Sequence, residues 1–349
     1  MDNEQRDALE AVDAVVNTRP VRRKKNFFEK NMIPLKGDSK KTKRRKGIFD
    51  SCILIVFVCA LVLVWVGVIE PWRARKLADE LENLFNGDAV VTEAPTEPPA
   101  SGQTHPPTTS TGEAITQRQS HAKLKARNSE YIGWLRAPGG SISMAVVQTA
   151  NNDYYLKRDF DLNRSKYGNP FVDYRVSFDP MSTNLIIYGH HMSNGTIFTY
   201  LTRYKQANVV KSNPIITLEL ADGTVRQYKI VSVMAINGRG QDDNGYVFAV
   251  NTADFASEEK FNGYVRQIKQ RSYVDTGVDV QYGDKLISLQ TCIYDFDYEF
   301  LYVIGRQLRP GESTAIPGAK ANSNPRLPQA LYDKQKKSNP YANAEIWLP

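Results

Sequence analysis

The sequence predicts a mainly β domain, either a barrel or a sandwich, that follows a single membrane-spanning helix. Six short runs rich in β-branched and aromatic residues lie between positions 123 and 309, where the composition is globular. Asp222-Gly223 separates two of these runs and favours a hairpin, because both residues tolerate a positive φ. An uncharged apolar run over residues 52–69 precedes the domain. Many short strands at this spacing are typical of barrels and sandwiches, and a barrel also removes exposed strand edges.

The six predicted strands are residues 142–148, 185–190, 215–220, 227–236, 285–291 and 300–308. One helix interrupts the series: Ser257 is its expected N-cap, and Phe261, Tyr264 and Ile268 recur at helical spacing on one face. Two further helical segments are expected before the strands. One covers residues 71–85, and the other ends within residues 131–135.

The chain is predicted to have five parts. They are a basic cytoplasmic arm (1–50), a transmembrane helix (51–70), a short helix with a Pro/Thr-rich linker (71–120), a barrel (121–309) and a polar tail (310–349). The linker cannot bury enough apolar surface to fold, so residues 86–120 are expected to form an extended spacer. The tail is expected to be mobile, although Ile346, Trp347 and Leu348 could pin its end to a surface.

The apolar run has the length and flanks of a membrane anchor. At about 1.5 Å per residue, residues 52–69 just cover a hydrocarbon core of roughly 30 Å, with Trp65 and Trp72 near the far interface. Residues 19–46 hold 13 Lys/Arg and two carboxylates, which predicts a cytoplasmic N-terminus and an extracellular barrel. The run starts too far into the chain for a cleaved signal peptide.

The basic arm also explains the net charge of the whole chain. That charge is +7, less than the excess carried by residues 19–46 alone, so the rest of the chain has no strong basic footprint. A nucleic-acid partner is therefore not predicted. The basic arm is expected to face the membrane surface, where its partner is anionic membrane lipid.

Cys292 is the one cysteine outside the apolar run, since Cys52 and Cys59 both lie within it. An extracellular domain usually pairs its cysteines or avoids them, so a thiol without a disulfide partner needs a reason. One interpretation is a small buried hydrophobic residue. The other is a nucleophile, which requires a base.

His190 is the candidate base. The chain has four histidines, and His190 and His191 are adjacent at the end of a predicted strand. Barrel strands can bring such an end to the same rim as Cys292, which is the arrangement of a Cys/His nucleophile pair. The thiolate attacks, and the imidazole protonates the leaving amine and then deprotonates the incoming nucleophile. A metal site is disfavoured by ligand number and spacing, and no cofactor is predicted.

Several ordered motifs around these residues resemble the class B sortases. They are NSEYIGWLRAPG, VVQ followed by NNDYYLKRDF, YGNPFVDYR, IIYGHHM and LQTCIYDF, spread over residues 128–308. The resemblance implies a closed eight-stranded β-barrel with N-terminal helices, and the late helix fits class B.

The resemblance also implies an activity and its residues. The family is a group of membrane-anchored Gram-positive transpeptidases that cleave a C-terminal sorting signal of secreted proteins. They transfer the acyl group through a Cys thioester to an amine of a peptidoglycan precursor or a pilin. Carried over to this sequence, Cys292 is the nucleophile and His190 the acid/base, while Asn152, Leu156 and Thr291 bind the sorting peptide.

One departure concerns the catalytic arginine, which the family often places eight residues after the cysteine. Here that position is Phe300, and the next arginine is Arg306, 14 residues after Cys292. Arg306 is retained as the nominal third catalytic residue, because it is the only arginine before the strand ends. If Phe300 faces Cys292, Arg306 lies roughly 20 Å further along the strand, and another donor such as Arg239 could substitute.

Two other classes of protein remain open. A pseudo-sortase would bind sorting-signal peptides without cleaving them, and Phe300 is the feature that favours it. An L,D-transpeptidase would surround its cysteine with a Ser-His-Gly-Cys type motif, whereas this chain has Leu-Gln-Thr-Cys.

Overall fold

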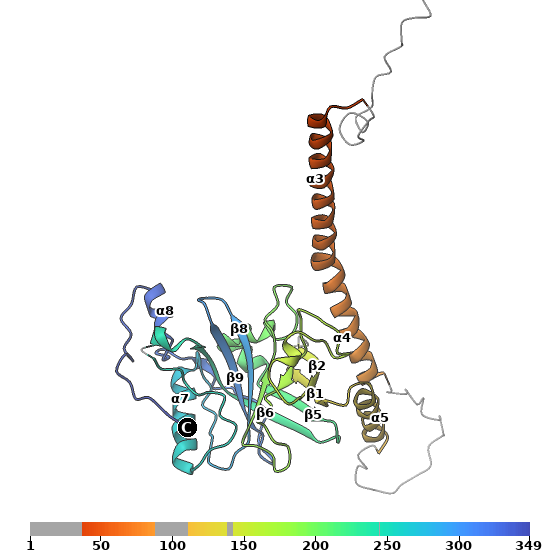
Figure 1. The fold of residues 1–349 in the computed structure, drawn as a ribbon. Coiled ribbons are helices and arrows are strands. Elements are labelled where there is room, and N and C mark those ends of the chain that lie inside the picture. The colour runs from red at the N-terminus through yellow and green to blue at the C-terminus, as the bar shows by residue number, and fades with distance from the viewer. Residues whose placement is uncertain (1–36, 88–110, 138–141, 244) are drawn as a thin grey trace, which may run out of the picture. The chain divides into compact units, whose positions relative to one another are not determined.

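The computed structural model describes residues 37–87, 111–137, 142–243 and 245–349. They fall into two compact units, one up to Trp72 and one from Arg73 onward. Most of the predicted basic arm and most of the predicted linker lie outside the described residues. Figure 1 shows the course of the chain.

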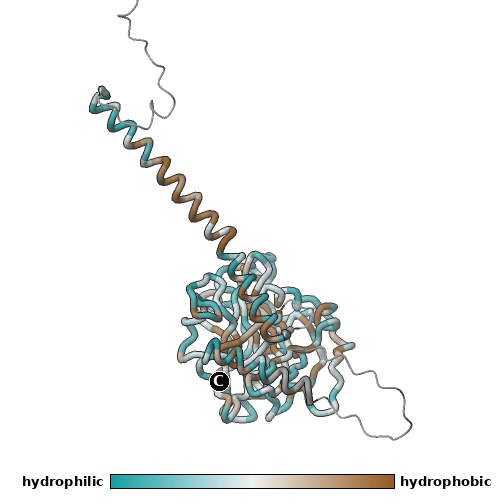
Figure 2. Tube along the Cα trace, turned by 90° about the vertical axis from the view of Figure 1, so that its right-hand side faces the viewer, coloured by the Kyte–Doolittle hydropathy of each residue, from teal (hydrophilic) through white to brown (hydrophobic). Residues whose placement is uncertain are grey.

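The first unit is helical. It contains α3 (Lys40–Val64) and the π-helical turn η1 (Trp65–Ile69), and α4 (Glu70–Asn86) continues from it. Ser39 caps α3, since its hydroxyl accepts a 3.2 Å hydrogen bond from the Thr42 amide. Figure 2 shows the apolar stretch along α3 in brown. Among the described residues, the helical stretch Lys40–Asn86 is the one long and apolar enough to cross a membrane.

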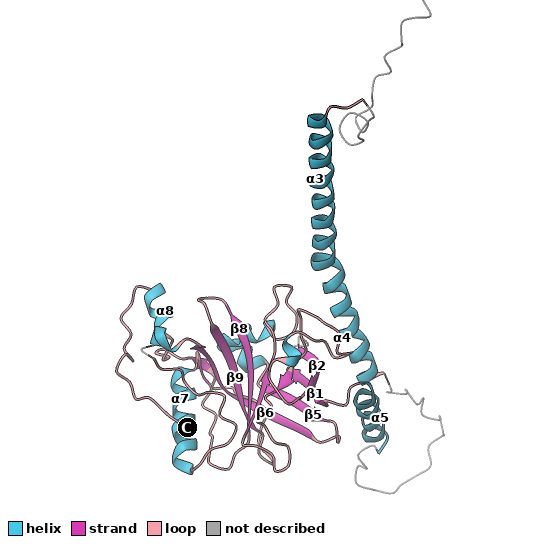
Figure 3. Ribbon diagram, in the orientation of Figure 1, coloured by secondary structure: helices cyan, strands magenta, loops and turns pink. Residues whose placement is uncertain are grey.

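The second unit is built on a closed barrel of eight strands, drawn in magenta in Figure 3, which confirms the predicted fold class. The strands are β1 (Tyr131–Ala137), β2 (Ile142–Val147), β3 (Phe171–Val172), β4 (Asn184–Tyr188), β5 (Ile215–Leu220), β6 (Val225–Asn237), β8 (Leu286–Ile293) and β9 (Glu299–Gln307). The two short strands β7 (Val274–Asp275) and β10 (Lys320–Ala321) form a separate pair.

The barrel order is β1-β2-β3-β4-β8-β9-β6-β5, and β5 pairs with β1 to close it. The β2–β3 and β4–β8 pairs are parallel, and the other neighbours are antiparallel. Aliphatic side chains such as Ile186, Val233, Leu289 and Val303 fill the core and are fully buried. Because β4 and β8 are parallel, their C-terminal ends, which are far apart in the sequence, lie at the same rim of the barrel.

Helices and short 3₁₀ turns lie outside the barrel. They are α5 (Thr111–Arg127), η2 (Tyr154–Leu156), η3 (Thr199–Lys205), α6 (Ala207–Ser212), η4 (Gly240–Asp243), α7 (Glu258–Arg271) and α8 (Gln329–Lys334). The late helix α7 is capped by Ser257 as predicted, through a 3.3 Å hydrogen bond from the Lys260 amide. Figure 3 shows α7 and α8 beside one side of the barrel and α5 beside the other.

Two predictions before the barrel are wrong. Tyr131 does not close a helix but begins strand β1, which is buried on both faces and so lacks the alternation that marks a strand. The spacer does not run to Ser120 either, because α5 already begins at Thr111. In the described part of α5, Ser120, His121 and Leu124 are buried, and the His121 ring contacts Glu219 at 3.1 Å.

The tail is expected to be mobile unless Ile346, Trp347 or Leu348 pins its end, and Trp347 does pin it. The tail lies against the barrel and α7, with Trp347 only 6% exposed. Its indole packs against Phe248 and Tyr264, and its Nε1–H donates to the Lys260 carbonyl at 3.1 Å. Gly263 in α7 makes room for the indole, since a Cβ there would lie 2.6 Å from Trp347.

Candidate functional site

Cys292 lies near the end of β8, directly opposite Phe300 on β9, which in turn faces Ile236 on β6. Side chains alternate along a strand, so Gln290 points to the same face of β8 as Cys292. Both residues line a cavity of about 700 Å³ at the barrel surface. The cysteine therefore sits in a groove rather than in the core.

His190 reaches the same cavity from the end of β4. Tyr188, the last residue of β4, is in register with Gln290; His190 follows Tyr188 by two residues just beyond the strand, as Cys292 follows Gln290 by two residues on β8. Neighbouring strands lie about 4.8 Å apart, so the segment that carries His190 lies beside the end of β8 that carries Cys292.

The His190 ring is fixed from two sides. Its Nε2–H donates to the Leu156 carbonyl at 2.8 Å. Gly168, at φ +61°, leaves space beside the ring, because a Cβ there would lie 3.0 Å from the His190 Cδ2 atom. With Nε2 engaged, Nδ1 is the ring nitrogen that can accept a proton.

His191 points elsewhere. Its ring stacks on Tyr294 at a centroid distance of 5.4 Å, and burial lowers the pKa of its imidazole. Its Nδ1 atom has no hydrogen-bond partner among the described residues. Of the adjacent pair, His190 is therefore the one that lines the groove with Cys292.

The Cys292 thiol is half-buried, and this burial raises its pKa. The thiol form therefore dominates near neutral pH, and a nucleophilic reaction must first remove its proton. The electrostatic environment alone does not activate this cysteine, which makes a neighbouring base more important.

Asn152 and Leu156 line the groove opposite the strands. The Asn152 amide donates to Asp173 at 3.1 Å, and its oxygen accepts from the Tyr174 amide at 3.1 Å. One N–H of Asn152 is left over for another acceptor. Leu156 contributes both its side chain to the groove and its carbonyl to His190.

Asp173 organises this wall, although no local sequence pattern predicts its role. It is fully buried and accepts hydrogen bonds from the Tyr188 hydroxyl at 2.6 Å and from Arg175 at 2.7 and 2.9 Å, besides Asn152. Burial alone would raise the pKa of this carboxyl, but the bonds from Arg175 and Tyr188 outweigh it and lower the pKa.

The floor of the groove is polar. The oxygen of the Gln290 side chain accepts from the Tyr302 hydroxyl at 2.6 Å and from the Asn251 amide at 3.2 Å. Thr291 also lines the cavity, but its hydroxyl is buried and has no hydrogen-bond partner among the described residues. Gln290 could have been found from sequence, because it lies two residues before Cys292 on the same strand face.

Arg306 is not brought to this site. It faces Leu286 at the other end of β8, is 1% exposed and lines a different cavity. Its guanidinium is bound by Glu312, with one hydrogen bond of 2.7 Å, and by the Asp279 carbonyl at 3.1 Å. The alternative donor, Arg239, has its guanidinium over the Tyr298 ring at 3.7 Å.

Comparisons with known proteins agree with this fold. No family model matches the sequence. Sortase B of Listeria monocytogenes is 29% identical over 176 residues, which cover 50% of this chain and 68% of the relative. The sortase B structure of Clostridium perfringens is 28% identical with a TM-score of 0.50, covering 54% of this chain and 99% of that one.

A Staphylococcus aureus sortase B–substrate complex shares the fold, with a TM-score of 0.56 at 20% identity over 70% of this chain and 100% of that chain. Sequence and fold together identify the chain as a homologue of the class B sortases.

Proposed function

We propose that this homologue of the class B sortases is a cysteine transpeptidase. It cleaves the C-terminal sorting signal of a secreted protein and transfers the acyl group to an amine of a peptidoglycan precursor or a pilin. The observation that carries the proposal is that His190 and Cys292 line one cavity, each two residues beyond the paired Tyr188 and Gln290 of the parallel β4–β8 pair.

In the first half-reaction, His190 Nδ1 takes the thiol proton and the Cys292 sulfur attacks the scissile carbonyl carbon. A C–S bond forms, the C–N bond breaks, and the imidazolium gives its proton to the leaving amine. In the second, the acceptor amine attacks the thioester, loses a proton to the imidazole, and the C–S bond breaks to return the thiolate.

The sorting peptide is proposed to lie in the groove between the η2 segment and the β8–β9 face. Asn152 supplies its remaining N–H, Leu156 an apolar contact, and Thr291 the wall beside Cys292. A sortase B of the same fold has been solved as a substrate complex, which supports substrate binding by this fold. Arg306 is left out of the proposed catalytic set because its guanidinium is buried against Glu312.

The proposed location follows from α3 and the basic residues before it. The helix crosses the membrane with its N-terminus in the cytoplasm and the barrel outside, and the basic arm lies on membrane lipid. Protease added to intact, wall-stripped cells should then release fragments of residues 123–309. Protection of that region until the cells are lysed would exclude this orientation.

The catalytic proposal is tested with the full chain in detergent. Peptides are taken from C-terminal sorting signals of secreted proteins encoded beside its gene. Intact mass spectrometry should detect an acyl adduct on wild-type protein that hydroxylamine removes, and no adduct on Cys292→Ala.

A second candidate function is a pseudo-sortase that binds these peptides without cleaving them. Phe300 favours it, because an apolar ring occupies the position of the donor expected opposite Cys292. Saturable peptide binding without an adduct, equal in wild-type and Cys292→Ala protein, would support this second function and reject the first.

A further inference from the structure

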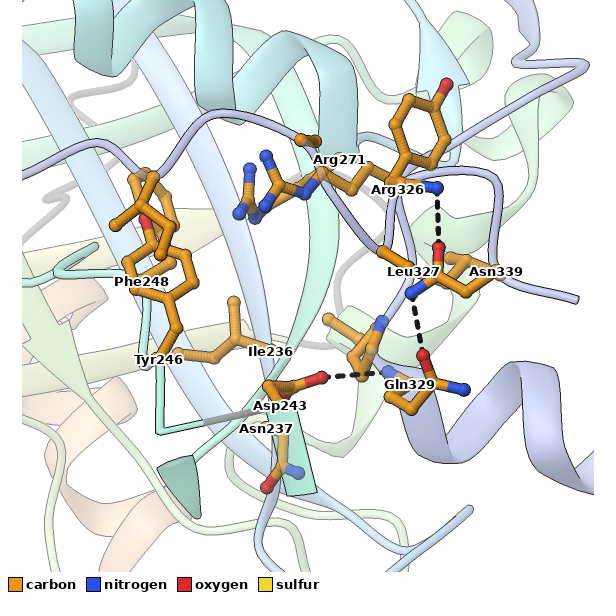
Figure 4. A pocket seen from close by; sticks show the side chains of 16 residues that line it. Ile236, Asn237, Asp243, Tyr246, Phe248, Arg271, Arg326, Leu327, Gln329 and Asn339 are labelled. Carbon is orange, nitrogen blue, oxygen red and sulfur yellow. Dashed lines mark hydrogen bonds between the residues drawn. The ribbon is translucent and has the colours of Figure 1, made fainter. Parts of the chain in front are cut away.

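A second cavity, of about 120 Å³, lies between the tail and the barrel. Figure 4 shows its side chains, which come from the end of β6, the following loop, α7 and the tail. Ile236 and Phe248 line both this cavity and the groove of Cys292. The two cavities therefore share a wall, but the second has no part in the proposed reaction.

Two guanidinium groups enter this cavity side by side (Figure 4). Arg271, on α7, is only 6% exposed and donates from Nη1 to the Gln267 side-chain oxygen. Arg326, in the tail, donates from Nη1 to the same oxygen at 3.2 Å and to the Glu345 carbonyl at 3.0 Å. One neutral oxygen thus serves two cations.

Neither guanidinium forms an ion pair within the described part of the chain. Asp243 is the carboxylate lining the cavity, and one of its oxygens accepts from the Gln329 amide at 2.9 Å. No hydrogen bond from Nε or Nη2 of either arginine is formed with the described residues. By contrast, Arg309, just before the tail, pairs with Asp279 at 3.0 Å and with Asp284 at 2.7 Å.

This arrangement is costly for the charged forms. Burial, and then the neighbouring Arg326, lower the pKa of Arg271 to about 10. Burial also lowers the pKa of Arg326. Asp243 offsets part of this cost for both arginines without a direct hydrogen bond to either, so two like charges still lie close together in a partly buried wall.

We propose that this cavity binds an oxyanion between Arg271 and Arg326. The open N–H groups of two guanidinium forks match the paired oxygens of a carboxylate or a phosphate, and the amides of Gln329 and Asn339 add neutral polar walls. The volume is roughly four times that of a molecule in liquid water, enough for such a group.

The bound anion would also affect the groove. The Arg271 guanidinium lies 4.6 Å from the centroid of the Phe248 ring, and Phe248 is part of the shared wall. An anion bound to both arginines would therefore connect Arg326 in the tail with Arg271 on α7, and through Arg271 with the Phe248 wall of the groove.

The test measures thermal unfolding of the full chain in detergent while inorganic phosphate or acetate is added, with NaCl at matched ionic strength as reference. A saturable rise in Tm of about 2–4 °C over NaCl is expected near tenfold excess over Kd. Phosphate acting alone identifies a tetrahedral oxyanion, and acetate acting at lower concentration identifies a carboxylate.

Arg326→Gln should abolish the rise in Tm. Arg266→Gln removes an exposed arginine from α7, the helix of Arg271, and should keep the rise. Arg326→Lys serves as the second variant if Arg326→Gln loosens the tail. Lysine retains the positive charge but lacks the paired N–H donors of the planar guanidinium, so phosphate should bind several-fold more weakly. No Tm rise beyond NaCl with either anion, or equal rises in Arg326→Gln and Arg266→Gln proteins, would overturn the proposal.

Discussion

Phe300 faces Cys292 directly across the antiparallel β8–β9 pair. This register confirms that the position eight residues after the cysteine lies opposite it and is occupied by an aromatic ring. Gly238 makes room for that ring, since a Cβ there would lie 2.4 Å from Phe300. The groove thus holds the proposed nucleophile and base, but an apolar group lies where a donor is expected.

Phe300→Arg should raise the rate of thioester formation. A guanidinium opposite Cys292 could donate to the developing oxyanion, and such a donor is worth about 10²–10³ in rate. The measurement is single-turnover acylation, with Phe300→Leu as the control that changes the ring without adding a donor. If both variants acylate at the same rate, position 300 does not limit the reaction.

Arg306→Ala should act on stability instead. The change removes a buried guanidinium and its charged hydrogen bonds to Glu312, which is partly exposed and keeps Lys229 as a partner, so the free energy of unfolding should fall by about 1.5–3 kcal/mol in denaturant unfolding. The acylation rate per folded molecule should change little. A loss of rate as large as that of Cys292→Ala, with the fold intact, would make Arg306 a catalytic residue after all.

His190→Ala should reduce acylation by about 10²–10⁴, because general acid–base catalysis is lost. His191→Ala is the matched control and should cost far less, since that ring stacks on Tyr294 outside the groove. Acylation rates of both variants decide the point. If His191 proves essential and His190 does not, then His191 acts as the base.

Alkylation of Cys292 should be slow at neutral pH and rise as the pH increases. Burial raises the thiol pKa above its usual value of about 8.5, so the reactive thiolate accumulates only on the alkaline side. Iodoacetamide labelling followed by peptide mapping separates Cys292 from Cys52 and Cys59. A plateau already reached near pH 6 would indicate a stabilised thiolate.

Asp173→Asn should weaken peptide binding more than turnover. It removes the charge that orients Asn152 and Tyr188, so KM should rise while kcat changes little. Stability should fall by about 1.5–3 kcal/mol for a lost charged hydrogen bond. Asp179→Asn, at an exposed carboxylate of the same loop, is the control. A fall in kcat with KM unchanged would contradict a positioning role.

Trp347→Ala should lower the free energy of unfolding by about 3–5 kcal/mol, whereas the exposed Leu348→Ala should change it by less than about 0.5 kcal/mol. Gly263→Ala should destabilise the wild-type chain, because its Cβ would meet the indole. In the Trp347→Ala background the same change should stabilise, since alanine favours helices by about 1 kcal/mol. Additive effects in this double-mutant cycle would show that the two residues do not interact.

Much of the barrel could be predicted because strands such as β5 and β6 carry dense β-branched runs. The strand β1 could not, since burial of both faces removes its alternation. The polar composition of the tail predicts mobility. Burial of Trp347 against α7 outweighs it, and the space for the indole beside Gly263 is visible in the structure alone. In the site, Cys292 and His190 follow from residue type and spacing, while Asp173 gains its importance from contacts between segments that no local pattern records.

The parallel pairing of β4 and β8 has a consequence for folding. Asn184 and Ser288, which hydrogen-bond across this pair, are 104 positions apart in the chain, so the pairing closes one of the longest loops in the barrel. Contacts of such sequence separation form late and slowly, because loop-closure entropy must be overcome first. His190 and Cys292 therefore meet only when the barrel closes. A newly made chain would not hold these two side chains in one groove until that step, so the proposed reaction could begin only once the barrel is complete.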